Sequence, residues 1–338
     1  MRIDAGIIST DAREAGVSAK ALEEAGYDGA FTYEGPHDPF LPIVGAALAT
    51  EKIELMTSIA VAFARNPMIL ANLGYDLNLL SKGRFILGLG SQIRPHITKR
   101  FSMPWSRPAA RMKEMISAIQ AIWDCWQNGS KLDFRGEFYT HTIMTPFFTP
   151  ASNPYGPPKI YVAAVGPLMT KAVAESADGL LVHPFHTLNY MEEIILPGIT
   201  EGLTNVGKSN SDFDCSISVM TATGLDDESF ASSVNAVRNQ IAFYGSTPAY
   251  RGVLDSCGVG DLQDRLNLLS KEGKWQEMGA LIDDELLNTI AVVSEKPEDA
   301  AAEIRKRYAG KGDRLTPALY SSNPALAPSL LNALKGLI

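Results

Sequence analysis

The sequence predicts an α/β protein in which eight parallel strands alternate with helices and close into a (β/α)8 barrel, the TIM-barrel architecture. Short apolar segments alternate with longer segments of helical periodicity along nearly the whole chain, which is the pattern of repeated βα units. Helix start and stop signals punctuate these segments at regular intervals. The length of 338 residues suits one barrel with insertions, and no linker or internal repeat divides the chain into two domains.

The first half of the chain contains four of the expected strand–helix units. Strands are expected over residues 3–8, 29–34, 53–61 and 84–89, and helices over 12–25, from 38–39, from 66–67 and over 108–126. Gly26 is placed to end the first of these helices. Asp38 and Asn66 each precede a proline, the combination of an N-cap with proline in the first turn. Residues 53–61 are rich in β-branched side chains and largely apolar, as a strand covered on both faces should be.

The second half continues the alternation of strands and helices after a polar, hairpin-like insertion over 131–141 and a proline-rich loop over 146–158. Strands are expected over 160–164, 179–183, 215–223 and 315–320, and helices from 167, over 188–203, over 226–244 and from 297. Residues 246–287 interrupt the pattern with helical pieces and suggest a lid or an interface. We therefore expect one domain, residues 1–338, with insertions near 129–158 and 246–288.

Composition narrows the class of protein. The net charge of -8 argues against general nucleic-acid binding, which needs clustered Lys and Arg. No apolar run is long enough to cross a bilayer, and no signal-peptide pattern begins the chain. The three cysteines, Cys125, Cys215 and Cys257, form neither a disulfide framework nor a zinc motif, which favours a cytoplasmic protein.

Two local patterns resemble known motifs and are better interpreted structurally. Gly88-Leu89-Gly90 lacks the third glycine of a dinucleotide fingerprint and lies on the fourth strand rather than the first. Residues 283–285 are consecutive acids, which on a helix do not share a face, so a solvated cap is expected there. We expect no metal site.

Catalytic groups of such barrels lie at the carboxyl ends of the strands. The chemistry-bearing residues at those positions are Ser9, Glu34, His37, residues 58–65, residues 91–96, Val165, Gly166, His183 and His186.

Two stretches of sequence carry a resemblance to a known family. Residues 57–67, TSIAVAFARNP, are followed by residues 80–90, LSKGRFILGLG, and a second match runs from VAAVGP at 162–167 to ADG at 177–179. This pattern is similar to that of the bacterial luciferase-like superfamily. The variant with DPFLP at 38–42 and LGSQ at 89–92 resembles its F420-dependent oxidoreductases more than the luciferases themselves.

The resemblance implies a non-prolyl cis peptide at Ser58–Ile59, where the third strand bulges against the back of a flavin-type ring. It also implies that Val165, Gly166 and the start of the following helix hold the cofactor phosphate, with His183 nearby, as a positive helix N-terminus can. The cofactor-binding residues expected on this basis are Ser58, Ile59, Ala60, Arg65, Gly90, Ser91, Ala164, Val165, Gly166 and His183.

The family commonly has a carboxylate at the end of the second strand, often followed by His. Glu34 matches the carboxylate, whereas Gly35 stands where the His would be and His37 is the available substitute. Glu34, His37 and His96 are therefore the expected catalytic residues. For Glu34 the alternative is a salt-bridged strand end, for the histidines a solvated loop, and for Arg65 a pairing with a carboxylate at the barrel rim. Phe101, Met103 and Trp105 either shape an apolar pocket or pack their loop.

The expected function is F420-dependent hydride transfer between the deazaflavin and a small organic substrate, such as a carbonyl, an alcohol or a conjugated bond. Sugar-phosphate dehydrogenases of this group have Glu after the glycines of the fourth strand, where this chain has Ser91-Gln92, so that substrate class is not expected. The alternatives are an FMN-dependent monooxygenase served by a separate reductase and a non-catalytic flavin-binding barrel. A homodimer is expected.

Overall fold

The computed structural model describes residues 1–9, 11–321, 323 and 325–336. Within these residues eight parallel strands close into a barrel in the order β1, β2, β3, β5, β8, β9, β10 and β12. Their bounds are β1 Arg2–Gly6, β2 Gly29–Thr32, β3 Glu54–Thr57, β5 Phe85–Gly90, β8 Lys159–Ala164, β9 Gly179–Val182, β10 Asp214–Ala222 and β12 Arg314–Leu319. The first and last strands pair with Arg2 opposite Arg314, which closes the barrel and confirms the predicted fold class.

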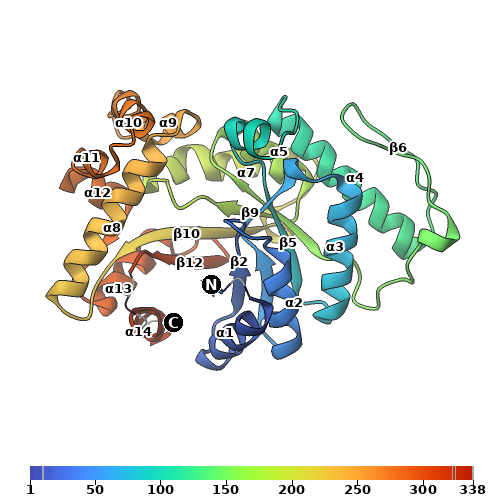
Figure 1. Ribbon diagram of the computed structural model, residues 1–338, viewed down its shortest axis with the longest axis horizontal. Coiled ribbons are helices and arrows are strands. Elements are labelled where there is room, and N and C mark those ends of the chain that lie inside the picture. The colour runs from blue at the N-terminus through green and yellow to red at the C-terminus, as the bar shows by residue number, and fades with distance from the viewer. Residues whose placement is uncertain (10, 322, 324, 337–338) are drawn as a thin grey trace.

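Helices cover the outside of the barrel (Figure 1). In chain order the helices that follow barrel strands are α1 Ala12–Ala25, α2 Phe40–Ala49, α3 Pro67–Leu80, α4 Pro108–Asn128, α5 Pro167–Ser176, α6 Leu188–Tyr190 with α7 Leu196–Asn205, α8 Asp227–Gly245 and α14 Leu326–Gly336. A further helix, α13 Pro297–Tyr308, precedes the last strand.

The sequence signals that start and end these helices behave as expected. Gly26 ends α1 in the left-handed conformation, with φ of 91°. The Asn66 side chain accepts a hydrogen bond from the backbone N–H of Ile69 at 2.9 Å, and Pro67 is the first helical residue of α3. The Asp38 carboxylate accepts from the N–H of Phe40 at 2.8 Å, so it serves the start of α2 although the helix itself begins after Pro39.

Two expected elements are interrupted. The third strand, expected over 53–61, ends at Thr57, and a separate two-residue strand, β4 Ala60–Val61, pairs with β5. The helix expected over 188–203 contains a π-helical stretch, Met191–Ile195, between α6 and α7. Both interruptions follow from local backbone geometry, which apolar periodicity does not report.

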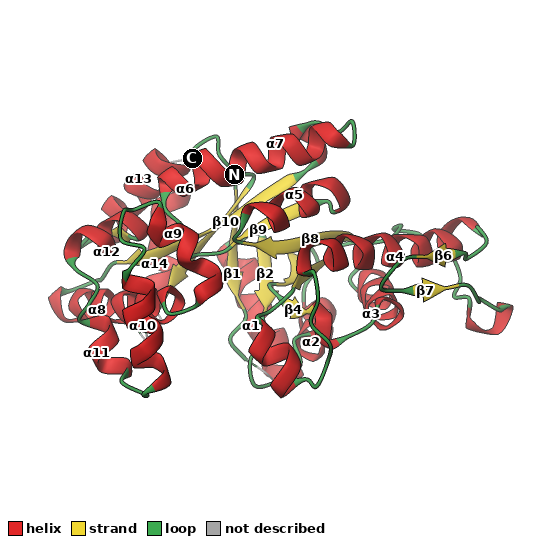
Figure 2. Ribbon diagram, turned by 90° about the horizontal axis from the view of Figure 1, so that it is seen from above, coloured by secondary structure: helices red, strands yellow, loops and turns green. Residues whose placement is uncertain are grey.

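The two segments expected as insertions leave the barrel in different directions. Residues after α4 form a small antiparallel hairpin, β6 Phe134–Arg135 with β7 Thr140–His141, at one end of the molecule (Figure 2). Residues after α8 form four short helices, α9 Arg251–Asp255, α10 Leu262–Lys271, α11 Trp275–Gly279 and α12 Asp284–Ile290, which gather beside α8 (Figure 1). The chain then adds β11 Val292–Val293 to the end of β10.

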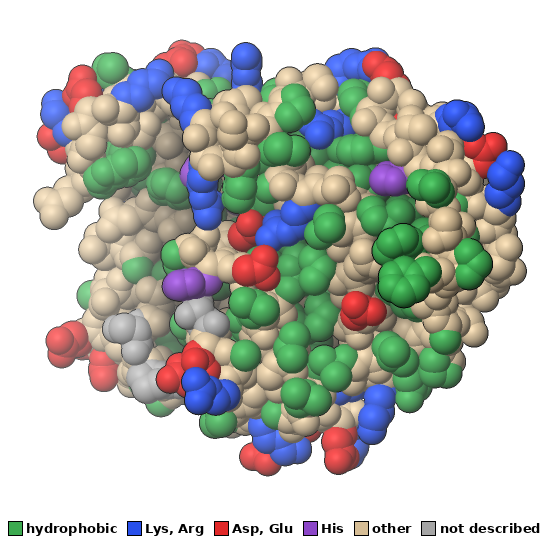
Figure 3. All heavy atoms as spheres, turned by 45° about the vertical axis from the view of Figure 1, so that its right-hand side comes forward, with side chains coloured by type: hydrophobic (Ala, Val, Ile, Leu, Met, Phe, Trp, Pro, Cys, Tyr) green, Lys and Arg blue, Asp and Glu red, His purple; other side chains and the backbone are tan. Residues whose placement is uncertain are grey.

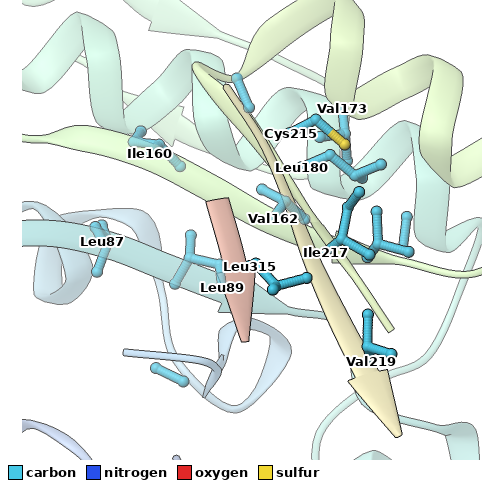
Figure 4. Packing of buried hydrophobic residues seen from close by; sticks show 14 of the residues in the cluster. Leu87, Leu89, Ile160, Val162, Val173, Leu180, Cys215, Ile217, Val219 and Leu315 are labelled. Atoms are coloured by element: carbon cyan, nitrogen blue, oxygen red, sulfur yellow. The ribbon is translucent and has the colours of Figure 1, made fainter. Parts of the chain in front are cut away.

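The main hydrophobic core lies between the strands and the helices around them. Side chains that point out of the barrel meet those of the covering helices, as Figure 4 shows for Val173 of α5 and its neighbours. The labelled strand residues are Leu87, Leu89, Ile160, Val162, Leu180, Cys215, Ile217, Val219 and Leu315. The apolar stripe of α4 is buried: Met112, Met115, Ile116, Ile119, Ile122 and Trp123. No helix in the described part of the chain is long and apolar enough to cross a membrane.

The amino ends of the strands are closed inside the barrel by charged side chains. Arg314 is fully buried and donates to both carboxylate oxygens of Asp4, at 2.7 and 2.6 Å. It also pairs with Glu54, which Arg2 contacts at 3.2 Å. A side chain at Gly29 would place its Cβ 2.3 Å from both Arg314 and Asp4, so the close approach of the pair requires glycine on β2.

Candidate functional site

Inward-pointing side chains at the carboxyl end of the barrel are open to solvent, and we call this opening the hollow. Along several strands the residue that points inward near this end is partly exposed although its neighbours are buried, as at Ala163 on β8, Ser218 on β10 and Phe31 on β2. Thr316 on β12 is likewise partly exposed. Because strand side chains alternate between the two faces, this pattern traces an opening that solvent enters from the top of the barrel.

A compact apolar cluster forms the floor of the hollow. It consists of the inward side chains Met56, Ile86, Tyr161 and Leu181, and Phe31, Ile59 and Ala163 pack on it. Below this cluster lie the ion pairs of Asp4 and Arg314. The site is therefore confined to the upper half of the barrel, where strand ends and loops supply its walls.

One wall is built where the third strand is interrupted. The peptide bond Ser58–Ile59 is cis, as expected, and both residues are partly exposed, whereas Ala60 is buried. A Cβ on Gly90 would lie 2.7 Å from Cγ1 of Ile59. Glycine at position 90 thus lets Ile59 lie directly against β5, which leaves an apolar platform beside the hollow.

A charged group lies next to this platform. Oε2 of Glu34 accepts from Nη1 of Arg65 at 2.6 Å and from the backbone N–H of Val61 at 2.7 Å. Arg65 also donates to Asp38 at 2.9 Å. Glu34 is therefore salt-bridged at the end of β2, and Arg65 pairs with rim carboxylates, the contacts foreseen as the structural alternatives for both residues.

The two expected catalytic histidines lie on exposed loops. His37 borders a separate small pocket of about 190 Å³ between the ends of β1 and β2, together with Ser9 and Tyr33. His96 is exposed and begins a π-helical turn, His96–Arg100. Arg100 at the end of that turn donates to the carbonyl of Gly35 at 2.7 Å, so the loops after β2 and β5 are joined. Among the described residues neither histidine has a hydrogen bond to Glu34.

The loop after β5 contains Ser91, an expected cofactor-binding residue, and three apolar residues for which either a pocket or a packing role was open. Ser91 is partly buried and donates to the carbonyl of Gln92 at 3.1 Å, and Gln92 has a positive φ of 58°. Phe101, Met103 and Trp105 pack against the main core, and the ring of Trp105 meets that of Phe63 edge-on at 5.7 Å. The apolar residues of this loop therefore support its packing.

The start of α5 is an uncapped helix N-terminus. Gly166 is the residue before the helix, and among the described residues no side chain caps the helix and no atom lies within 4 Å of a Cβ built on Gly166. Because a helix leaves its first N–H groups unpaired, these amides are free to bind an anion. Val165 is partly exposed and Ala164 is buried, and the hydroxyl of Tyr190 donates to the carbonyl of Val165 at 3.1 Å, which fixes the approach to the helix.

The wall at the end of β9 contains two tyrosines that the sequence analysis did not single out. His183 follows β9 and packs against the rings of Tyr244 and Tyr250, at centroid distances of 4.6 and 4.9 Å, while the two tyrosine rings lie 6.4 Å from each other. Burial raises the pKa of Tyr250 to about 12. The ring of Phe185 lies 6.2 Å from each tyrosine. Tyr244 lies in the last turn of α8 and Tyr250 belongs to the insertion, so only the folded chain brings them to His183.

A family model described as luciferase-like monooxygenase matches residues 2–314. An uncharacterised protein of Mycobacterium tuberculosis is 53% identical over 324 residues, which are 96% of this chain and 94% of that protein. A 5,10-methylenetetrahydromethanopterin reductase of Archaeoglobus fulgidus is 27% identical over 85% of this chain and 83% of its own. An F420-dependent glucose-6-phosphate dehydrogenase of Beutenbergia cavernae is 28% identical over 75% of this chain and 76% of its own.

Solved structures share the fold over nearly the whole chain. The coenzyme F420-dependent tetrahydromethanopterin reductase of Methanopyrus kandleri superposes with a TM-score of 0.79 at 18% identity, over 97% of this chain and 96% of that one. The oxygenating constituent of 3,6-diketocamphane monooxygenase of Pseudomonas putida, in complex with FMN, gives a TM-score of 0.69 at 14% identity over 99% and 96%.

Proposed function

The chain belongs to the luciferase-like monooxygenase family, and within this family of oxidoreductases we propose that it is an F420-dependent enzyme that transfers a hydride to or from a small organic substrate. The observation that carries the proposal is the hollow at the carboxyl end of the barrel, with an apolar platform at Ile59 and the free amides of α5 on its rim. The names of several relatives, which are F420-dependent reductases and dehydrogenases, support this choice of cofactor.

The residues present fit a flavin-type cofactor. Ile59, which packs directly on the buried Gly90, offers an apolar surface, beside which Ser58, Ala60 and Ser91 supply backbone and hydroxyl groups. The first amides of α5, after Ala164, Val165 and Gly166, would bind a phosphate because the positive end of the helix dipole favours an anion. When bound, F420 supplies a carbon that gives or takes a hydride and does not readily form oxygen adducts.

The protein's own contribution is to orient the reactants and to handle a proton. Arg65 and the N–H of Val61 hold Glu34 by Oε2, which leaves Oε1 as the oxygen free to meet a proton or a substrate hydroxyl. His37 and His96, on the two joined loops, are the candidates to exchange that proton with solvent. A positioned acid or base of this kind contributes about 10²–10⁴-fold to a rate.

The test is a fluorescence titration of the purified protein with F420, FMN and FAD, followed by a screen for turnover with alcohols, ketones and enones. We expect tight binding of F420 and hydride transfer. Preference for FMN, with oxygen uptake when a reductase supplies reduced flavin, would instead establish a monooxygenase. Cofactor binding without any turnover would leave a binding barrel. Because Ser91-Gln92 stands where sugar-phosphate dehydrogenases have Glu, we expect no activity on glucose 6-phosphate.

We also propose that the protein is a homodimer, as expected from the sequence. Apolar side chains gather on the face shown in Figure 3, and exposed ones lie on α2 and α3, which pack against each other: Leu41, Leu48, Ile69 and Leu79. Exposed apolar area of this kind marks a contact with another protein surface. Light scattering should give twice the chain mass, and Leu48→Glu should reduce the measured mass.

The expected cytoplasmic location stays a prediction.

A further inference from the structure

His183 occupies the wall of the hollow that the proposed reaction does not yet use. It is the residue after β9, and the alternation along that strand gives it the same orientation as Leu181, which lies in the inner cluster. His183 therefore points into the barrel above the floor. It is partly exposed, while Phe185 and His186 just after it are buried.

The hydrogen bond to its ring fixes the position of the proton. Nδ1 of His183 accepts from the backbone N–H of Phe185 at 3.1 Å, which requires a lone pair on Nδ1. A neutral ring then carries its proton on Nε2, because one nitrogen of a neutral imidazole is the donor and the other is the acceptor. A doubly protonated ring would lose this bond and place two N–H groups against each other.

The second nitrogen of the ring, Nε2, keeps its proton available for a ligand. Among the described residues no hydrogen bond reaches Nε2 of His183, and this atom remains accessible to solvent, whereas Nε2 of His186 is buried without a partner. Nδ1 of His186 instead lies 2.8 Å from the carbonyl oxygen of His183 and donates to it. His183 thus presents one fixed N–H donor on the inner wall.

Aromatic rings hold the imidazole in this orientation. Tyr244 meets it edge-on, with an interplanar angle of 77°, and Tyr250 lies against it at 46°. These two contacts, one from α8 and one from the turn at Pro248–Tyr250, restrict the orientation of the ring. The insertion is therefore part of the site, since one of its residues sets the position of His183.

The groups that face His183 are uncharged. They are His186, Tyr244 and Tyr250, and no carboxylate contributes to its electrostatic surroundings in the described part of the chain. Burial, with a smaller effect of His186, lowers the pKa of His183 to about 3. The ring is therefore neutral at physiological pH, and its N–H donor is present over the whole working range.

We propose that His183 is a neutral hydrogen-bond donor of the active site, whose Nε2–H binds a carbonyl-type oxygen of the bound cofactor ring or of the substrate. This proposal rests on the proposed function for the identity of the oxygen but not for the state of the histidine. A fixed neutral donor stabilises negative charge that develops on such an oxygen without transferring a proton itself. Tyr244, Tyr250 and the N–H of Phe185 are positioning groups.

The state of the ring is tested without any cofactor. The chain has five histidines, so the imidazole signals of ¹⁵N-labelled protein are few enough to assign by comparison with His183→Gln. We expect His183 to be the Nε2–H tautomer with constant shifts from pH 5 to pH 9. Titration with a midpoint between pH 6 and 7, or the Nδ1–H tautomer, would overturn the proposal.

The role of the donor is tested by three variants in the presence of the cofactor that the wild-type protein binds. His183→Phe keeps a ring packed against the tyrosines and removes the N–H, and we expect a loss of about tenfold, the usual effect of one hydrogen bond. His183→Gln should restore part of it through its amide N–H. His141→Phe makes the same substitution on β7 of the hairpin at one end of the molecule (Figure 2) and should behave as wild type.

The constant that changes in His183→Phe identifies the oxygen that His183 binds. A weaker cofactor Kd in His183→Phe assigns it to the cofactor, and a loss in kcat/KM at unchanged Kd assigns it to the substrate. Either loss should be the same at pH 6 and pH 9. If all three variants match the wild type, or if His183→Phe removes one limb of the pH profile, the proposal is wrong. If the wild-type protein binds no flavin or deazaflavin, the proposed function fails while the ¹⁵N result still decides the state of His183.

Discussion

At the scale of the residue, Glu34 has two different oxygens. Oε2 is engaged by Arg65 and by the backbone N–H of Val61, and these bonds hold the carboxylate beside the platform of Ile59. Oε1 has no hydrogen bond among the described residues. A carboxylate fixed by one oxygen keeps its geometry while the other meets a reactant, which is the arrangement that acid–base catalysis needs.

Glu34→Gln should slow hydride transfer far more than it weakens cofactor binding. Gln keeps the size of the side chain and can still accept from Val61, but it cannot exchange a proton. We expect single-turnover transfer to fall by about 10²–10⁴-fold at saturating cofactor, with a much smaller change in Kd. Single-turnover measurement removes binding from the comparison.

Asp38→Asn is the matched control for this substitution. Asp38 is the other carboxylate bound to Arg65, so its replacement loosens Arg65 and leaves Glu34 in place. We expect a rate close to wild type. A Glu34→Gln rate equal to wild type would remove Glu34 from the acid–base step and make His96 the better candidate, whereas equal losses in both variants would assign Glu34 to the positioning of Arg65.

His186 gives a prediction about stability at the same scale. It is 2% exposed, and burial lowers its pKa to about 4, partly offset by its bond to the carbonyl of His183. In the unfolded chain the pKa is about 6.5, so between pH 6.5 and 4 the unfolded chain binds more protons and stability falls as the pH is lowered. At pH 5 this amounts to about 2 kcal/mol.

His186→Phe should therefore reduce the loss of stability between pH 7 and pH 5 by about 2 kcal/mol, measured by urea unfolding at both pH values. The control is Tyr308→Phe, because Tyr308 packs edge-on against His186 at 5.7 Å and does not titrate in this range. Equal pH dependence in wild type and His186→Phe would show that the pKa of His186 is the same in the folded and the unfolded chain.

At the scale of the element, α5 owes its proposed role to its uncapped start. Gly166 has φ of -85° and ψ of 157°, the conformation of an ordinary N-cap residue, and there is open space where a side chain would lie. A residue with a carboxylate could therefore replace Gly166 without strain and would itself bind the amides that we assign to the phosphate.

Gly166→Asp should abolish cofactor binding and leave the fold intact. The new carboxylate would cap α5 and repel the phosphate, so the midpoint of thermal unfolding should be unchanged or slightly higher. Gly166→Asn is the matched control, since it has the same size without the charge and should weaken binding less. A titration beside a melting curve measures both effects. Unchanged affinity in Gly166→Asp would place the phosphate elsewhere, as at the ends of the seventh and eighth barrel strands.

The elements also show which features of the structure can be predicted from the sequence. Helices and strands were predictable because periodicity and capping residues such as Gly26 and Asn66 are local signals. The cis bond at Ser58–Ile59 came from the family resemblance. The contacts of His183 with Tyr244 and Tyr250 were not predictable, because they join α8 and an insertion to a strand end through tertiary packing that no spacing reports. The catalytic and cofactor roles of the site residues stay predictions.

At the scale of the whole molecule, the buried ion pair of Asp4 and Arg314 joins residues 310 positions apart and ties the first barrel strand to the last. Arg314 also pairs with Glu54 on β3. This network fills the lower half of the barrel, where an apolar filling is the alternative, and it keeps the hollow confined to the upper half. The pair lies far from the proposed site, so its effect should be on stability alone.

Breaking the pair should be far more costly than replacing it. Asp4→Leu leaves the charge of Arg314 buried without Asp4, and Arg314→Met leaves that of Asp4. The two side chains are 0% and 1% exposed in the native protein, Arg314 and Asp4 respectively. Removing one partner of such a pair costs about 3–5 kcal/mol. The double variant buries no unpaired charge at these two positions, although Glu54 and Arg2 remain, so it should lose much less than the sum of the single losses. Urea unfolding of the four proteins completes the double-mutant cycle. Cofactor affinity, measured in each variant that stays folded, should not change. Additive losses would show that Asp4 and Arg314 contribute independently, and that closure of the barrel does not depend on their contact.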